Sequence, residues 1–293
     1  MDGDERFEAL NSGRRSRAER FSAKKYWGQH FLRDSGVVDA IVAAVDPGPG
    51  LCVLEIGPGS GALTGPLVAS GATVAALEID PDLVRFLRTL YPPPALHVWE
   101  GDAARADWGA LVQQACGARA FTVVGNLPYY LTGPLLARLW EADDPWERAV
   151  VMCQAEVAVR LAAEVGSVPA GAPTVLLQNL ATVRVLLQVP PAAFDPPPEV
   201  QSTVIEIVRR AHPVVESRAA LRTLVRAGFG QRRKTLVRAL ASTGFRSEWW
   251  KARLQDLSID SRIRAERLSL DQWREISALF LREAPHAERQ KLV

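Results

Sequence analysis

A short polar and aromatic motif follows an apolar run near the middle of the chain. Residues 121–124 lead into residues 125–129, which read Gly-Asn-Leu-Pro-Tyr. The exocyclic amine of adenine is a poor nucleophile, because its lone pair is delocalised into the ring. The side-chain oxygen of Asn126 and the carbonyl of Pro128 could accept its two N–H bonds, while the ring of Tyr129 stacks on the base. The motif therefore indicates an adenine N6-methyltransferase site, although Asn and Pro after a strand also form ordinary turns.

A glycine-rich turn upstream indicates where the methyl donor binds. The apolar residues 51–56 lead into residues 57–61, Gly-Pro-Gly-Ser-Gly, and then into a helical stretch at 62–70. This is the first strand, turn and helix of a doubly wound fold. The third glycine comes one residue earlier than in the dinucleotide motif, and Pro58 removes an amide that could face a phosphate. The turn therefore favours a ligand without a pyrophosphate.

Acidic residues end the next two predicted strands. Residues 72–77 end at Glu78, where such folds place a carboxylate on ribose hydroxyls. Residues 95–99 are followed by Asp102, whose carboxylate could accept a hydrogen bond from the amino group of a bound adenine. Either acid alone could be an ordinary polar residue at a strand end. Together with the glycine turn, they predict S-adenosylmethionine as the cofactor.

Six motifs, in this order, resemble the ribosomal RNA adenine N6,N6-dimethyltransferases over nearly the whole chain beyond its N-terminal tail. They are Gln-His-Phe-Leu at 29–32, Glu-Ile-Gly-Pro-Gly at 55–59, Glu-Ile-Asp at 78–80, Gly-Asp at 101–102, Asn-Leu-Pro-Tyr at 126–129 and Phe-Asp-Pro-Pro-Pro-Glu-Val-Gln-Ser at 194–202. The C-terminal stretches 229–236 and 264–269 are similar to the KsgA type of that family. The resemblance implies dimethylation of two adjacent adenosines in a hairpin near the 3′ end of 16S rRNA. It also implies a pre-30S particle as the partner and a role in ribosome biogenesis.

The resemblance assigns roles to individual residues. It places Gly57 under the methionine part of the cofactor, and Asn126 between the cofactor and the target amine. The implied cofactor-binding residues are His30, Leu32, Gly57, Glu78, Asp102 and Asn126, and the implied catalytic residues are Asn126, Leu127, Pro128, Tyr129 and Phe194. Phe194 is expected to clamp the flipped base opposite Tyr129. Without their neighbouring motif residues, His30 would be interpreted as capping a turn and Phe194 as filling the core.

Two alternative functions stay open. Erm-type methylases of large-subunit rRNA resemble the catalytic half, but they typically read Asn-Ile-Pro-Tyr and have a different C-terminal domain. A mainly non-catalytic ribosome assembly factor would keep a basic C-terminal domain but would need no cofactor pocket. Two segments also depart from the family pattern: residues 130–133, after the catalytic motif, and residues 166–173, whose Gly, Pro and Ser content predicts a mobile loop.

Charge is distributed unevenly along the chain. Residues 209–293 hold 19 Lys and Arg against 9 Asp and Glu, a net charge of +10, whereas the whole chain carries only +2. A polyanion should therefore bind the C-terminal part first. The expected phosphate-binding residues are Arg232, Arg233 and Lys234. The alternative interpretation is that this basic stretch is only the solvent-exposed start of a helix. Residues 1–21 alternate acids and arginines and predict a disordered tail.

The cysteines and the hydropathy pattern indicate a cytoplasmic protein. Cys52, Cys116 and Cys153 show neither metal-ligand spacing nor a disulfide framework, and we expect them to be free and buried. No apolar run approaches the length of a membrane span, and the N-terminal segment lacks the apolar core of a signal peptide. In-line methyl transfer needs no metal, and the enzyme is expected to be a monomer.

These residues require an α/β architecture with a second domain. Alternating strands and helices predict a Rossmann-like class I methyltransferase sheet, parallel except for one strand, at 22–210. The helical pattern at 211–293 predicts a smaller, all-helical RNA-binding domain. Within it, Leu221, Leu224 and Phe229 share one helix face, and residues 269–272 have the form of a capping box.

Overall fold

The computed structural model describes residues 24, 28–118, 120–231 and 233–283. The predicted tail at 1–21 and Arg232 lie outside the described residues. Contacts between Cα atoms divide the chain into two units, Met1–Ala155 with Val185–Ile207 and Glu156–Arg184 with Val208–Val293. The predicted domain limits at 21/22 and 210/211 stay a prediction.

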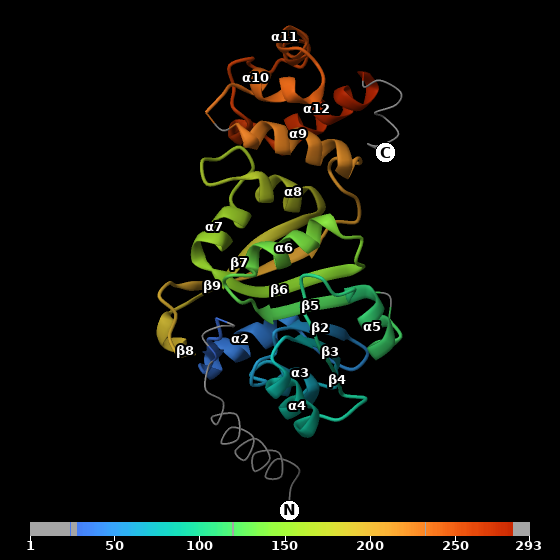
Figure 1. Ribbon diagram of the computed structural model, residues 1–293, viewed down its shortest axis with the longest axis vertical. Coiled ribbons are helices and arrows are strands. Elements are labelled where there is room, and N and C mark those ends of the chain that lie inside the picture. Colours follow the sequence, from blue (N-terminus) through green and yellow to red (C-terminus); the bar gives the residue numbers. More distant parts are fainter. Residues whose placement is uncertain (1–23, 25–27, 119, 232, 284–293) are drawn as a thin grey trace, which may run out of the picture. The chain divides into compact units, whose positions relative to one another are not determined.

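Seven strands form one sheet in the order β4-β3-β2-β5-β6-β9-β7 (Figure 1). The five strands from β4 to β6 pair in parallel. Strand β9 is antiparallel to its two neighbours. At its N-terminal end, Ala155 N, just after β6, donates to Gln201 O. At its C-terminal end, Arg210 N donates to Leu180 O, just before β7. The predicted parallel sheet with one antiparallel strand is therefore confirmed. The strands are β2 (Cys52–Ile56), β3 (Thr73–Glu78), β4 (Leu96–Glu100), β5 (Phe121–Asn126), β6 (Trp146–Gln154), β7 (Ala181–Val189) and β9 (Ser202–Arg209).

Helices cover both faces of this sheet. Successive strand residues point to opposite faces, and Val53, Val74 and Val124 lie in one core cluster with buried residues of α2, α3 and α4. Helix α5 packs on β2 and β3, but its buried residues Trp108 and Val112 lie outside that cluster, on the other face. The helices of this part are α2 (Ser35–Val45), α3 (Thr64–Ala69), α4 (Pro81–Leu90), α5 (Trp108–Cys116) and α6 (Thr132–Glu141).

The parallel strands bring the sequence motifs to one edge of the sheet. Strand β2 ends just before Gly57, β3 ends at Glu78 and β5 ends at Asn126. The register pairs Ile56 with Leu77 and Glu55 with Val124, so these three strand ends lie level with one another. Ligands of open α/β sheets bind at the carboxyl ends of the strands, where these residues lie.

A two-stranded antiparallel sheet, which the sequence pattern did not predict, lies beside the large one. Strand β1 (Phe31–Leu32) pairs with β8 (Phe194–Asp195), and the register places Leu32 opposite Phe194. A 3-10 helix, η2 (Pro191–Ala193), precedes β8. The pairing joins the first and last of the motifs in the catalytic half.

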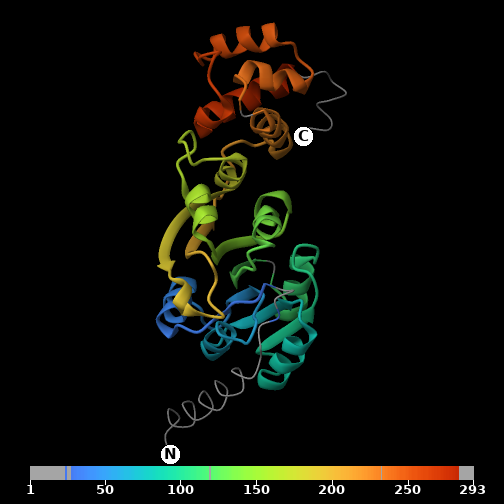
Figure 2. The same cartoon turned by 60° about the vertical axis from the view of Figure 1, so that its left-hand side comes forward.

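The second unit has its own helical core. Figures 1 and 2 show helices α9 to α12 packed together, in orange and red. Residues of α8, α9, α10, α11 and α12 contribute to one buried cluster that contains Trp250, Trp273 and Phe280. Ser269 Oγ accepts from Gln272 N, and Gln272 Oε1 accepts from Ser269 N, which confirms the predicted capping box. The elements are α7 (Ala155–Ala162), α8 (Ala172–Leu180), α9 (Arg218–Gly230), α10 (Leu236–Leu240), η3 (Ala241–Thr243), α11 (Ser247–Asp256), η4 (Ala265–Arg267) and α12 (Leu270–Glu283).

The Gly- and Pro-rich segment 166–173 forms turns in the second unit. The N–H of Ser167 bonds to the carbonyl of Glu164, and the N–H of Ala170 bonds to the carbonyl of Ser167. Ala170 is buried, and Gly166 lies against the backbone of Arg267 and Leu268. The segment therefore has a defined packing partner, while its predicted mobility stays a prediction.

The expectation that all three cysteines are free is wrong for two of them. Cys52 on β2 and Cys116 at the end of α5 form a disulfide, with their Cα atoms 6.1 Å apart. They are 64 residues apart in sequence, and only the packing of α5 on the sheet brings them within bonding distance. Cys153 is free and buried, as expected. No helix within the described residues is long and apolar enough to span a membrane.

Candidate functional site

The motif residues line one pocket at the carboxyl ends of β2, β3, β4 and β5. It encloses about 950 Å³ of empty space, including its open mouth. All six predicted cofactor-binding residues line it, as do Leu127, Pro128 and Tyr129 of the predicted catalytic set. The remaining lining residues are Gly28, Gln29, Phe31, Glu55, Ile56, Pro58, Gly59, Ser60, Ala62, Leu63, Leu77, Ile79, Gly101, Ala103, Leu131 and Leu135.

Glu78 is held in place by the backbone. Its Oε2 accepts from the N–H of Gly59 at 3.0 Å and its Oε1 from the N–H of Asp80 at 2.9 Å. Burial raises the pKa of Glu78, and the backbone hydrogen bonds act against that rise. Each carboxylate oxygen has a second lone pair, so Glu78 can accept hydrogen bonds from a ligand without giving up its anchors.

Gly57 and Gly59 line the pocket. Their φ angles are 64° and 57°, a region that residues with a Cβ rarely adopt. A Cβ on Gly59 would lie 3.4 Å from the ring of Phe31, and one on Gly57 would lie 3.9 Å from the carbonyl of Asn126. The glycines therefore allow a tight turn whose backbone a ligand can approach closely.

Asp102 lies in the turn that follows β4. Its Oδ1 accepts from the N–H of Ala104 at 2.9 Å, which orients the carboxylate within its own turn. Arg105 lies 3.5 Å from Oδ2 and is itself almost fully exposed. The side chain of Asp102 is one-third exposed and lines the pocket.

A hydrogen bond joins the side chain of Asn126, at the end of β5, to the backbone of His30, just before β1. Asn126 Nδ2 donates to the carbonyl oxygen of His30 at 2.9 Å. The amide oxygen Oδ1 therefore points away from His30 and can act as an acceptor. The ring nitrogen Nδ1 of His30 lies 2.8 Å from the carbonyl oxygen of Pro196, just past β8. Leu32 is 5% exposed and combines core packing with pocket lining. The β1–β8 pairing thus positions His30 and Leu32 at the pocket.

The predicted catalytic motif leads directly into α6. The carbonyl oxygen of Pro128 accepts from the N–H of Leu131 at 3.0 Å and from Oγ1 of Thr132 at 3.1 Å, so both of its lone pairs are used. In this conformation the start of α6 uses the Pro128 carbonyl, and its expected role as an acceptor for the target amine stays a prediction.

Tyr129 presents an oriented ring. Its hydroxyl lies 2.5 Å from the hydroxyl of Ser202 at the start of β9, and its ring stacks near that of His30, with centroids 5.6 Å apart and planes inclined by 27°. Burial raises the pKa of the Tyr129 hydroxyl, against the hydrogen bond with Ser202. The ring is therefore fixed at its far end while its face remains part of the pocket.

Phe194, unlike Leu127, Pro128 and Tyr129, is not among the residues that line the pocket. Its side chain is 4% exposed and belongs to the core cluster of the sheet, and it does not line the pocket. In this conformation it fills the core, as the alternative interpretation expects. Its role as a clamp stays a prediction.

The predicted RNA-binding cluster lies in the other unit, between α9 and α10. Arg233 and Lys234 are exposed, and the N–H of Lys234 bonds to the carbonyl of Gln231. Gln231 also lines a polar hollow together with Arg222 and Arg226, one turn apart on α9, and with Ser242 and Thr243 of η3. The basic residues of this region thus include Arg222 and Arg226 as well as the predicted cluster at 232–234.

Sequence reasoning missed several residues around the pocket. Glu55 is 1% exposed and accepts a hydrogen bond from Thr64 Oγ1 at 2.7 Å. Gln29 and Asp80 stand inside two of the motifs, which could have indicated them, but Lys24 has no such signal. Among the described residues, no three His, Cys, Asp or Glu side chains gather into a possible metal site.

Comparisons with known proteins agree with this geometry. Residues 20–281 match the sequence model of the family described as Ribosomal RNA adenine dimethylase. A protein of Thermosynechococcus vestitus named Ribosomal RNA small subunit methyltransferase A is 42% identical over 264 residues, covering 88% of this chain and 97% of that protein.

Two solved structures are similar over most of their length. A dimethyladenosine transferase from Plasmodium falciparum has a TM-score of 0.70 and 24% identity, covering 86% of this chain and 98% of that one. The 23S rRNA methyltransferase ErmE has a TM-score of 0.67 and 26% identity, covering 85% of this chain and 98% of that one. The predicted fold class is confirmed.

Proposed function

The chain belongs to the ribosomal RNA adenine dimethylase family, and from this we propose that it transfers methyl groups from S-adenosylmethionine to the N6 atoms of two adjacent adenosines. The target is a hairpin near the 3′ end of 16S rRNA, since the 42% identical relative is named for the small subunit. The observation that carries the proposal is the pocket that joins the six cofactor-binding residues to Leu127 and Tyr129. The reaction belongs to ribosome biogenesis in the cytoplasm, on a pre-30S particle, with the enzyme acting as a monomer.

The pocket suits an adenosine-containing cofactor. Glu78 keeps free lone pairs beside its two backbone anchors, which suits the two hydroxyls of a ribose. Asp102 provides a second, oriented carboxylate for the amino group of the adenine ring. The left-handed glycines leave room for the methionine part next to Gly57. When bound, S-adenosylmethionine supplies an electrophilic methyl group on a good leaving group.

The protein's own contribution is to orient and polarise the target amine. Asn126 Oδ1 is directed by the bond from Nδ2 to the His30 carbonyl, and it serves as one acceptor for an N–H of the amine. The carbonyl of Leu127 serves as the second, because that of Pro128 is already bonded twice. Two acceptors on one nitrogen draw its lone pair out of conjugation and aim it for in-line attack. The ring of Tyr129 holds the flipped base by stacking.

RNA capture is shared with the second unit. Arg233 and Lys234, together with Arg232, provide phosphate contacts, and the hollow lined by Arg222 and Arg226 extends the basic surface. Such contacts supply affinity and salt dependence but little sequence discrimination. Selection of the target adenosines then depends on RNA shape and on the base pocket.

Primer extension on rRNA tests the proposal, because N6,N6-dimethyladenosine stops reverse transcriptase. The purified enzyme and S-adenosylmethionine are added to small and large subunits from a strain that lacks the modification, with Asn126→Ala as the inactive control. We expect two adjacent stops near the 3′ end of 16S rRNA with the wild type and none with the variant. Stops in the large-subunit rRNA would indicate an Erm-type enzyme. Tight binding to small subunits without any stop would indicate an assembly factor.

A further inference from the structure

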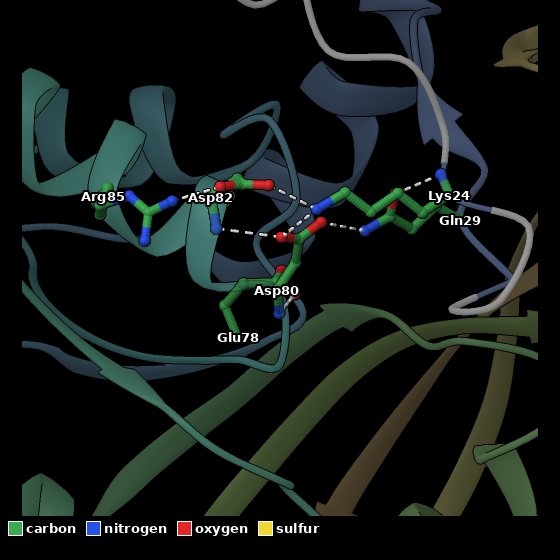
Figure 3. Close-up of polar contacts among 6 residues, drawn as sticks. All are labelled: Lys24, Gln29, Glu78, Asp80, Asp82 and Arg85. Carbon is green, nitrogen blue, oxygen red and sulfur yellow. Dashed lines mark hydrogen bonds and ion pairs between the residues drawn. The ribbon is translucent and has the colours of Figure 1, made fainter.

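The orientation of Glu78 depends on the turn that follows β3. One of its two oxygens is held by the N–H of Asp80, so the carboxylate can face a ribose only while that turn keeps its shape (Figure 3). Asp80 also accepts from the N–H of Asp82 at 3.0 Å, which caps the first turn of α4. The backbone and side chain of Asp80 therefore connect the pocket carboxylate to the start of a helix.

Asp80 is a buried carboxylate that accepts from Lys24, Gln29 and the backbone of Asp82. Its side chain is 2% exposed, and Lys24 Nζ lies 2.8 Å from Oδ1 while Gln29 Nε2 donates to Oδ2 at 3.1 Å. Burial acts to raise the pKa of Asp80, but the bonds from Lys24 and Gln29 outweigh it and hold the pKa below its ordinary value. A buried charge of this kind is stable only while its partners remain in place.

Lys24 and Gln29 are the partners that come from the N-terminal side. Lys24 Nζ also lies 2.6 Å from Asp82 Oδ2, so it bridges two carboxylates (Figure 3). Gln29 uses both ends of its amide: Oε1 accepts from the backbone N–H of Lys24 at 2.9 Å, and Nε2 donates to Asp80. Gln29 also lines the pocket, next to His30. The same contacts that neutralise Asp80 thus attach the pocket-lining segment to the turn after β3.

We propose that Lys24, Gln29 and Asp80 are positioning residues that hold Glu78 in the orientation needed to bind the cofactor. The inference rests on the proposed cofactor site and names residues that act on it through Glu78. Loss of the Lys24 ammonium leaves Asp80 buried without its cation. The carboxylate then turns toward water, the turn at 79–82 loosens, and Glu78 loses its Asp80 anchor.

The test is the cofactor affinity of RNA-free protein, measured by calorimetric titration. Lys24→Met keeps most of the aliphatic stem and removes the charge, and we expect it to weaken binding of S-adenosylmethionine by about tenfold, the scale of a hydrogen bond to a charged group. The matched control is Arg85→Met. The Arg85 side chain is 70% exposed and, within the part of the chain that the structure describes, pairs with Asp82 and not with Asp80. We expect its affinity to stay within about twofold of wild type.

The sign of the change separates positioning from long-range electrostatics. S-adenosylmethionine carries a net positive charge, so removing a nearby cation should strengthen its binding if the charge acted only through space. Positioning predicts weaker binding, and equally so for S-adenosylhomocysteine, which has no net charge. In turnover assays the KM for the cofactor should rise while kcat at saturating cofactor stays close to wild type. Lys24→Arg, which keeps a cation able to bridge both carboxylates, should restore most of the affinity.

Wild-type affinity in folded Lys24→Met, or an equal loss in Arg85→Met, would overturn the inference. Gln29→Leu gives an independent measurement on the same carboxylate, and circular dichroism verifies the fold of each variant. Glu78→Gln distinguishes a failure of the proposed cofactor site from a failure of the proposed positioning residues. If Glu78→Gln loses affinity and Lys24→Met does not, the inference fails while the cofactor site stands. If the wild type binds neither compound, the proposed function itself fails.

Discussion

The buried carboxyl of Glu55 should make the stability of the fold depend on pH. Glu55 lies on β2, is 1% exposed and has Thr64 Oγ1 as its hydrogen-bond donor. Burial raises its pKa from 4.5 to about 7; the bonds from Thr64 oppose this rise and the charge of Glu78 adds to it. The folded protein therefore keeps a proton on Glu55 that the unfolded chain has already released.

The sign of the effect follows from this difference in proton binding. The stabilisation is fully present below the unfolded pKa of 4.5 and is lost as pH rises toward the folded pKa of about 7. Each pH unit between the unfolded and the folded pKa corresponds to about 1.4 kcal/mol in the free energy of unfolding. The free energy of unfolding should therefore fall by up to about 3 kcal/mol across this window. Above the window the carboxylate is ionised in both states, and this contribution no longer changes with pH.

Glu55→Gln tests this reasoning, because it keeps an oxygen for Thr64 but cannot titrate. Urea unfolding followed by circular dichroism at several values between about pH 5 and pH 8 gives the free energy of unfolding of each protein. We expect the variant to gain about 2–3 kcal/mol relative to wild type between the two ends of this range. Glu100→Gln, at an exposed acid that ends β4, should run parallel to wild type. Parallel curves for wild type and Glu55→Gln would refute the argument, whatever the offset between them.

Three further changes should have distinct outcomes. Gly125→Ala should lower the free energy of unfolding by about 1–3 kcal/mol in urea titrations, because its Cβ would lie 2.6 Å from the carbonyl oxygen of Ile56. Gly133→Ala, in α6 and with nothing within 4 Å, should not lower it. Tyr129→Ala should slow single-turnover methyl transfer by about tenfold or more, since stacking on a base contributes about 1–3 kcal/mol, and Tyr129→Phe should stay within a few-fold of wild type; equal rates for Tyr129→Ala and wild type would argue against stacking. Joint replacement of Arg233 and Lys234 by Ala should reduce the slope of log affinity for RNA against log salt concentration by about 1.5–2. An unchanged slope would indicate that the two side chains are only solvent-exposed and do not contact phosphates.

Local patterns in the sequence were enough to predict the main sheet and many of the residues that line the pocket. Apolar runs ending in Gly57, Glu78 and Asn126 predicted parallel strands, and strands in parallel register must end at one edge. The residues at these strand ends therefore lie close together. The capping box at Ser269 and Gln272 was equally local, because it needs only residues three positions apart.

Contacts between distant segments were decided by the tertiary structure alone. Three such contacts join residues far apart in the chain. They are the pairing of Leu32 with Phe194, the disulfide between Cys52 and Cys116, and the ion pair of Lys24 with Asp80. Hydrophobic periodicity records which face of an element is buried, but it carries no information about which remote segment covers that face.

The site shows the same division at the level of single atoms. Residue type and spacing indicated that Asn126, Pro128 and Tyr129 could bind an adenine. Only the fold shows that the start of α6 uses both lone pairs of the Pro128 carbonyl, and that the bond to His30 directs the Asn126 amide. A sequence specifies which groups can accept a hydrogen bond, whereas their availability depends on which donors the folded chain brings to them.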